Sequence, residues 1–150
     1  MSIDANITVE LTENTTKCHS AIEIIHPLLK EGWSITHNGR GCYLAVGDKD
    51  NSEWLFVESI TINNLANIIK QKEDQKEIVG IVLTWNGTDI GGALLFWPNN
   101  TITLGLDSNR QIIFMQGNYK ITNFQWYLEK LLPPLNDSFG VEYFSCEEHV

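Results

Sequence analysis

Residues 144–150, FSCEEHV, place a thiol, two carboxylates and an imidazole in four consecutive positions. Cys146 and His149 are three residues apart, a spacing that can ligate zinc. A structural zinc site takes four protein ligands, and the other Cys/His cluster in the sequence is Cys18-His19 with His26 nearby. The spacing does not require the two clusters to meet in space. We therefore interpret the segment as an acidic contact strip or a solvated end, and we predict no metal site.

A cysteine nucleophile needs a neighbouring base or a helix N-terminus to favour its thiolate. Cys18 lies beside His19 near the start of a predicted helix, but adjacent helix positions point about 100° apart. Cys42 has the surroundings of a small core residue. The sequence contains no phosphate-binding loop, nucleophile elbow or paired acids. We predict no catalytic residue and no cofactor, so the protein is not expected to be an enzyme, and any role of the three cysteines stays open.

Two turns contain other residue types that bind ligands. Residues 37–41, His-Asn-Gly-Arg-Gly, could cradle an anion, but a hairpin turn is the favoured interpretation. After the Asn86-Gly87 turn, the pair Gly91-Gly92 indicates a bulge in a strand. Trp85 and Trp97 fall at strand ends, where an aromatic side chain can anchor a partner or close the edge of a core.

Charge is the most informative total, because 19 acidic residues against 10 basic residues give a net charge of −9. A protein this acidic is repelled by nucleic acid and by anionic membranes, so we expect neither as a partner. Its field favours a basic protein partner. The carboxylates expected to meet such a partner form two clusters, Asp48, Asp50 and Glu53 in one and Glu142, Glu147 and Glu148 in the other. A solvated surface is the alternative for both clusters.

The first half of the chain predicts strands and two helices. Residues 3–11 alternate apolar and polar side chains, which is typical of a strand with one wet face. Residues 15–31 have helical spacing with Pro27 inside, so we expect a kinked or divided helix that stops at Gly32. Residues 33–37 and 42–46 flank the turn and predict a hairpin. A strand at 54–57 and a helix at 61–72, followed by a solvated tail, come next.

The second half predicts a series of strands and one more helix. Strands are expected at 78–84, 90–97, 101–106 and 110–115, joined by short turns into an antiparallel meander. Thr122 and Gln125 have the spacing of a capping box, and Pro133-Pro134 are expected to end the helix that follows. A last strand is expected at 141–146.

Together these elements predict one α+β domain over residues 1–150. We expect a mostly antiparallel sheet, a meander of about six to eight strands, with two to three helices packed on one face. The longest apolar runs are too short to span a membrane, and the first residues do not resemble a secretory signal. A cytoplasmic protein with reduced cysteines is therefore expected.

The chain resembles the immunity proteins of bacterial contact-dependent growth inhibition and related polymorphic toxin systems. The likeness lies in its single-domain size, its acidity, its meander and an aromatic helix, Phe124-Gln125-Trp126-Tyr127-Leu128, ahead of the Pro-Pro pair. These proteins share no diagnostic motif, so no residue is carried over. The resemblance implies a non-enzymatic inhibitor that neutralises its own cognate protein toxin, a basic and in many cases nuclease partner, whose bound phosphates an acidic surface can mimic.

The resulting hypothesis is that the two carboxylate clusters cover a cationic cleft, with Trp85 or Trp97 as the desolvated centre. Two other classes of protein stay open. One is a domain that binds a small ligand on the concave face of its sheet. The other is a metal-dependent hydrolase that uses Cys146 or His149.

Overall fold

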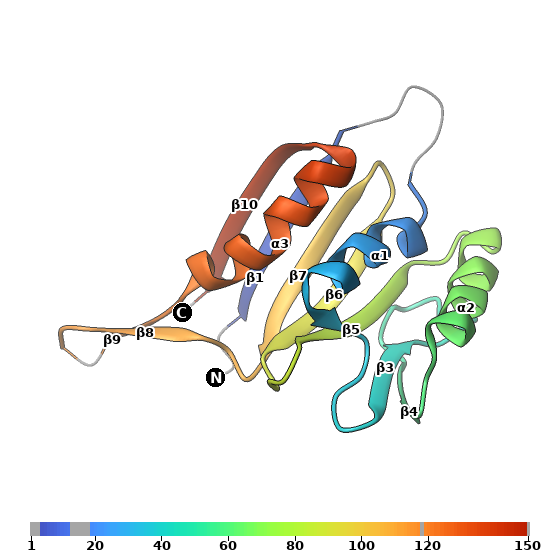
Figure 1. The fold of residues 1–150 in the computed structure, drawn as a ribbon, viewed down its shortest axis with the longest axis horizontal. Helices are drawn as coiled ribbons and strands as arrows, with labels where there is room; N and C mark the ends of the chain where they lie inside the picture. The colour runs from blue at the N-terminus through green and yellow to red at the C-terminus, as the bar shows by residue number, and fades with distance from the viewer. Residues whose placement is uncertain (1–3, 13–18, 118, 150) are drawn as a thin grey trace.

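The computed structural model describes residues 4–12, 19–117 and 119–149. In these residues the chain forms three helices and ten strands, drawn in Figure 1. The helices are α1 (Ala21–Glu31), α2 (Ile62–Asp74) and α3 (Phe124–Phe139). The strands are β1 (Asp4–Leu11), β2 (Trp33–Ser34), β3 (Arg40–Leu44), β4 (Trp54–Glu58), β5 (Val79–Trp85), β6 (Gly91–Trp97), β7 (Thr101–Ser108), β8 (Ile112–Met115), β9 (Tyr119–Thr122) and β10 (Val141–His149).

Eight of these strands form one antiparallel sheet in the order β10-β1-β7-β6-β5-β3-β4, with β2 also paired to β5. The predicted α+β class and mostly antiparallel sheet are confirmed. Strands β5, β6 and β7 form the predicted meander. Strand β1 then separates β7 from β10, so β10 is one edge of the sheet and β4 is the other.

One face of the sheet is covered by helices, and the opposite face of β6, β7, β1 and β10 is free of them (Figure 1). The alternation of β1 sets the pattern. Its residues Ala5, Ile7, Val9 and Leu11 are buried beneath the helices, and Asn6, Thr8 and Glu10 lie on the helix-free face. Helices α1 and α3 lie over the sheet, and α2 adds Leu65 and Ile69 to the same core. This agrees with the wet face predicted for the first strand.

Helix α1 runs without a break from Ala21 to Glu31, so the expected division into two pieces is wrong, and the expected kink stays a prediction. Ser20 caps the helix by accepting a hydrogen bond from the backbone N–H of Glu23, and the predicted stop at Gly32 is confirmed. Gly32 takes a φ of 138°, which favours glycine. Pro27 lies inside the helix, and the N–H that it lacks would have bonded to the carbonyl of Glu23, a residue at an exposed position. Of the predicted helical segment 15–31, residues 15–18 lie outside the described ranges, and His19 and Ser20 precede the helix.

Helix α3 overturns the expectation that Pro133-Pro134 end it, because it continues through both prolines to Phe139. The carbonyl that would bond to residue 134 in a regular helix is that of Lys130. The indole N–H of Trp33 donates to this oxygen at 3.0 Å and replaces the missing donor. The start also differs by one residue, because Asn123 caps the helix and Thr122 ends β9.

Two predicted strand pairings are corrected. The turn at Asn38-Gly39 exists, with φ of 51° and 78°, but its hairpin is limited to one bridge between His37 and Arg40. Strand β2 pairs with β5 instead, and β3 pairs with β4 and β5. The strand expected at 110–115 forms β8, which leaves the main sheet and pairs with β9 in a separate two-stranded ribbon.

Candidate functional site

The helix-free face carries a row of side chains that crosses four strands. Register places Trp97 beside Thr101, Thr101 beside Glu10, and Glu10 beside Tyr143. Directly paired residues in an antiparallel sheet point to the same face, so these four side chains share one surface. Trp97 and Tyr143 are both exposed at the two ends of this row.

The next row along the strands contains Leu95 on β6 and small polar side chains on β7, β1 and β10. Thr8 is paired with Thr103 on one side and with Ser145 on the other. The indole N–H of Trp97 donates to the hydroxyl of Thr103 at 2.8 Å, which fixes the orientation of the ring. An oriented aromatic beside a shallow hydroxyl-rich surface is suited to contact a flat protein surface.

The charge of this surface is negative. Glu10 and Glu147 are exposed on it, and Glu147 lies 3.6 Å from His149. Across the described residues of β6, β7, β1 and β10, no Lys or Arg points to the helix-free face. We name the set Trp97, Glu10, Tyr143 and Glu147 the open-face patch.

The predicted cluster at residues 142–148 is divided by the pleat of β10. Glu147 pairs with Asn6 on the helix-free face. Glu148 pairs with Ala5 on the opposite face, and its side chain is 14% exposed. Its carboxylate accepts hydrogen bonds from the N–H and hydroxyl of Thr122. Glu148 is therefore engaged inside the molecule, whereas Glu147 can meet a partner.

Glu142 occupies a third position, at a groove between α3 and β10. The groove has a volume of about 710 Å³, and Glu142 is exposed at it together with Glu129 and Asp137. The three carboxylates predicted as one cluster thus lie in different environments: Glu147 on the helix-free face, Glu148 against Thr122, and Glu142 at the groove.

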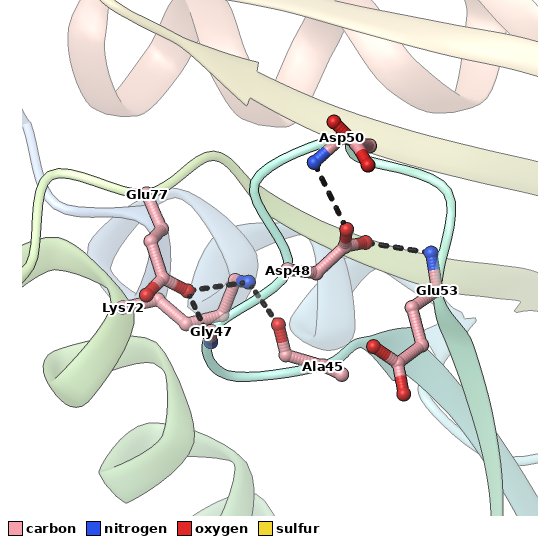
Figure 2. Close-up of polar contacts among 7 residues, drawn as sticks. All are labelled: Ala45, Gly47, Asp48, Asp50, Glu53, Lys72 and Glu77. Atoms are coloured by element: carbon pink, nitrogen blue, oxygen red, sulfur yellow. Dashed lines mark hydrogen bonds and ion pairs between the residues drawn. The ribbon is translucent and has the colours of Figure 1, made fainter.

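The other predicted cluster lies in the loop between β3 and β4, shown in Figure 2. Asp48 is 7% exposed and accepts hydrogen bonds from the backbone N–H groups of Asp50 and Glu53 at 3.1 and 2.6 Å. The hydrogen bond from the Glu53 N–H is the main cause that holds the pKa of the Asp48 carboxyl below its usual value. Burial opposes this effect, and the Asp50 N–H adds to it. Asp48 therefore organises this loop, while the side chains of Asp50 and Glu53 are exposed.

Beside this loop, a buried lysine holds α2 in place (Figure 2). The ammonium of Lys72 donates to the carbonyl of Ala45 at 2.6 Å and lies 3.1 Å from the Glu77 carboxylate. The N–H of Gly47 is the main cause that lowers the pKa of Glu77, and Lys72 adds to it. Because β3 and β4 lie at the end of the sheet away from β10, the two acidic clusters lie at opposite edges.

The two predicted aromatic anchors differ in their surroundings. Trp97 belongs to the open-face patch. Trp85 packs edge-on against Trp33 and Trp126, and the ammonium of Lys130 lies 5.2 Å from its ring centre. Trp85 is thus part of the packing between α3, β2 and β5.

A pocket of about 540 Å³ opens on the helix-free face at the β3 side of the sheet. Its floor is formed by Cys42, Val82 and Thr84, and Arg40 and Asp89 are at its polar rim. Burial, with the Asp107 charge as a smaller cause, raises the pKa of the Cys42 thiol. The thiol is therefore held protonated and is unsuited to act as a nucleophile.

Cys146 and His149 do not converge as a metal pair would. Residues three apart on a strand point to opposite faces, and Cys146 packs against the core while His149 is exposed. Burial also raises the pKa of Cys146. Over residues 4–12, 19–117 and 119–149, no three His, Cys, Asp or Glu side chains come together as metal ligands. Cys18 lies outside those ranges.

The chain matches no protein-family model, no curated protein sequence and no solved structure. Among the described residues, the helices all lack the length and apolar character needed to cross a membrane. What the fold and the open-face patch show is an α+β protein whose sheet has one surface with exposed carboxylates and aromatic side chains.

Sequence reasoning missed Glu10 and Tyr143 as members of this surface. The alternation of residues 3–11 already placed Glu10 on a wet face. Its neighbours come from β7 and β10, about 90 and 130 residues further along the chain, and the register that joins them is set by packing of the core face.

Proposed function

We propose that the protein is a non-enzymatic inhibitor that binds and neutralises a cognate, basic protein toxin, in the role of an immunity protein held in the cytoplasm. The observation that carries this proposal is the open-face patch. Glu10 lies in the row that runs from Trp97 to Tyr143, Glu147 lies further along β10, and the described residues of β6, β7, β1 and β10 include no Lys or Arg. Aromatic anchors within a charged rim are the composition of strong protein–protein contacts. A nuclease, whose cleft binds phosphate, is the class of toxin that an acidic surface suits best.

The contact surface follows from the arrangement of the side chains. Glu10 and Glu147 would steer a basic partner and pair with its Arg or Lys side chains. Trp97 would supply the desolvated centre, since its ring is already held by Thr103 and loses little freedom on binding. Asp48, Glu148 and Trp85 are engaged within the fold and are left out of this surface.

The first test is a pull-down of the tagged protein from its native cells at low and high salt, with bound proteins identified by mass spectrometry. The expected result is one basic, stoichiometric partner that is released as salt rises. An unchanged set of bound proteins with no basic member at either salt concentration contradicts the proposal.

Matched charge reversals then locate the surface on the purified pair. Glu10→Lys with Glu147→Lys should weaken binding strongly, whereas Asp50→Lys with Glu53→Lys changes the net charge equally at the far edge of the sheet. Trp97→Ala should cost about 2 kcal/mol, roughly 30-fold in Kd. Equal losses from both reversals would mean that overall charge, rather than this face, determines binding.

A second candidate, a small-ligand-binding domain, is favoured by the pocket at Cys42, Val82 and Thr84. Its volume of about 540 Å³ suits a small molecule. Thermal-shift measurements with a metabolite set test this candidate, and a shift that is lost in Val82→Phe would place the ligand in this pocket.

A further inference from the structure

The β8–β9 ribbon extends away from the body of the molecule as an arm (Figure 1). We use the name arm for residues 110–122. Pairing places Ile113 beside Ile121 and Met115 beside Tyr119, and these four side chains share one face of the ribbon. This face therefore contains no polar residue except the Tyr119 hydroxyl. Tyr119 is 64% exposed, and Phe114 on the other face is 70% exposed.

The root of the arm is tied to the body at several points. Glu148 accepts from Thr122 and lies 3.7 Å from Arg110. The N–H of Gln111 donates to the hydroxyl of Tyr127, which is buried in α3, and the carbonyl of Gln111 accepts from Asn123. A two-stranded ribbon has no core of its own and is marginal in water. The hydrogen bonds at the base of the arm and the exposed apolar side chains along it together indicate an element that docks against another surface.

The charge of the arm indicates which surface it fits. The arm contains Arg110 and Lys120 and no acidic residue, in a chain whose net charge is −9. Arg110 is engaged with Glu148 at the root, so Lys120 is the cation that the arm exposes. Lys120 is exposed, with its ammonium 5.6 Å from the Phe114 ring centre. A basic apolar arm is repelled by a basic partner protein and attracted to an acidic surface, which this chain itself presents.

The groove between α3 and β10 has the complementary character. Its floor is apolar, formed by Leu128, Leu132, Val141 and Phe144. Its acidic residues are Glu129, Asp137 and Glu142, and no Lys or Arg is among the described residues that line it. The groove runs beside β10, an edge strand of the main sheet. Among the described strands β10 pairs with β1 alone, so the backbone N–H and C=O groups on its outer side can pair with a further strand.

We propose that the arm of one copy docks into the α3–β10 groove of a second copy, so that two copies form a reciprocal dimer. Each copy offers one arm and one groove, so a two-fold arrangement fills both and closes the assembly. The apolar face of Ile113, Met115 and Tyr119 lies on the groove floor. Lys120 lies on the other face of the ribbon beside Phe114, and its long side chain reaches past the edge of β9 to the acidic rim. Tyr143 lines both the groove and the open-face patch, whereas Trp97 and Glu10 lie outside the groove and stay accessible in the dimer. The dimer does not rest on the inhibitor function.

The test is the mass of the full chain in solution, measured by light scattering and sedimentation over a range of concentrations. The expected mass is twice the 17.0 kDa of the chain. Met115→Asp with Tyr119→Asp should raise the dissociation constant about tenfold or more and leave a monomer, because it places carboxylates against the acidic groove. Met115→Leu is the matched control and should remain dimeric. Both positions are exposed, so circular dichroism should stay unchanged. The melting temperature of the variant should match that of the wild-type chain diluted below its dimer dissociation constant.

A charge exchange distinguishes this docking from a non-specific association. Lys120→Glu should weaken the dimer, and so should Glu129→Lys with Glu142→Lys in the groove. The chain that combines all three substitutions should recover dimer formation. A mass of 17.0 kDa at every concentration overturns the proposal, as does a dimer that is insensitive to the arm and groove variants. A monomer that binds anionic phospholipid vesicles through the arm also overturns it and places the arm on a lipid surface.

Discussion

The indole N–H of Trp33 donates a 3.0 Å hydrogen bond to the carbonyl oxygen of Lys130, the acceptor that Pro134 leaves without its helical donor. This contact joins β2 to α3 across 97 positions of the chain. Trp33 is also packed edge-on against Trp85 and Trp126, so one side chain both satisfies the helix and closes the core beside it.

We predict that Trp33→Phe and Pro134→Ala are coupled. Trp33→Phe should lower the free energy of unfolding by about 2 kcal/mol, because it leaves the Lys130 carbonyl without a donor and removes packing. Pro134→Ala supplies a backbone N–H to the same carbonyl, so Trp33→Phe should cost about 1 kcal/mol less in that background. Urea unfolding of the four chains measures the coupling, and strictly additive costs would show that the indole bond does not replace the helical one.

The same contact explains why the end of α3 could not be predicted from sequence. A Pro-Pro pair ordinarily ends a helix since it removes two donors. Here the carbonyl of Glu129 is left at an exposed position and that of Lys130 is paired to a residue far along the chain. The local pattern contains no sign of Trp33, so the stop was expected where the helix continues.

The elements that could be predicted are those whose apolar period is set locally. The strands around Ile81, Leu94 and Leu104 and the helix around Leu65 are confirmed within a few residues. Strand partners depend on distant packing, so the pairing of β2 with β5 and the separate β8–β9 ribbon could not be read from local signals. For the candidate site, Trp97 and Glu147 were named from sequence and lie on one face, whereas the burial of Asp48 and Glu148 depends on backbone donors brought in by folding.

Substitution of Lys72 should be costly for stability. This side chain is 1% exposed, bonds the Ala45 carbonyl and lies beside Glu77. Lys72→Ala should lower the free energy of unfolding by about 3 kcal/mol, because it removes a fully buried side chain together with its bonds to the Ala45 carbonyl and the Glu77 carboxylate. Lys70→Ala, on the exposed side of the same helix, should change it by less than about 0.5 kcal/mol. Similar values for both variants in thermal or urea unfolding would contradict the assigned role.

Stability should fall on acidification partly through the loop of Figure 2. The pKa values of Asp48 and Glu77 are lowered by folding, mainly by backbone N–H groups. Their contribution is therefore present above the unfolded pKa values, near 4, and is lost as the pH falls through the folded values. Asp48→Asn should reduce stability at pH 7 and make the further loss of stability on acidification smaller. Asp50→Asn should leave the dependence of stability on pH as it is in the unchanged chain. Melting temperatures between pH 2 and pH 7 provide the comparison. If the melting temperature falls equally with pH in all three chains, Asp48 does not contribute to the loss of stability in acid.

The two described thiols should react slowly in the folded protein. Burial raises the pKa of Cys42 and of Cys146, so a smaller fraction of each is thiolate near pH 8 than in the unfolded chain. Alkylation by iodoacetamide, followed peptide by peptide with mass spectrometry, should be slower for both sites in buffer than in urea. Native reaction as fast as in urea at Cys42 would indicate that the pocket on the helix-free face exposes an activated thiol.

Removing the Glu148 carboxylate should loosen the root of the arm without unfolding the sheet. Glu148 accepts from the N–H of Thr122 at 3.0 Å and from its hydroxyl at 2.6 Å. Glu148→Ala should therefore speed amide exchange at Thr122 by roughly tenfold, equivalent to the loss of about 1.4 kcal/mol of local protection. Glu147→Ala is the matched control, because Glu147 points to the helix-free face and leaves these bonds intact. Hydrogen exchange measured by NMR resolves Thr122 in both chains, and unchanged exchange in Glu148→Ala would mean that Tyr127 and Asn123 hold the arm without the carboxylate.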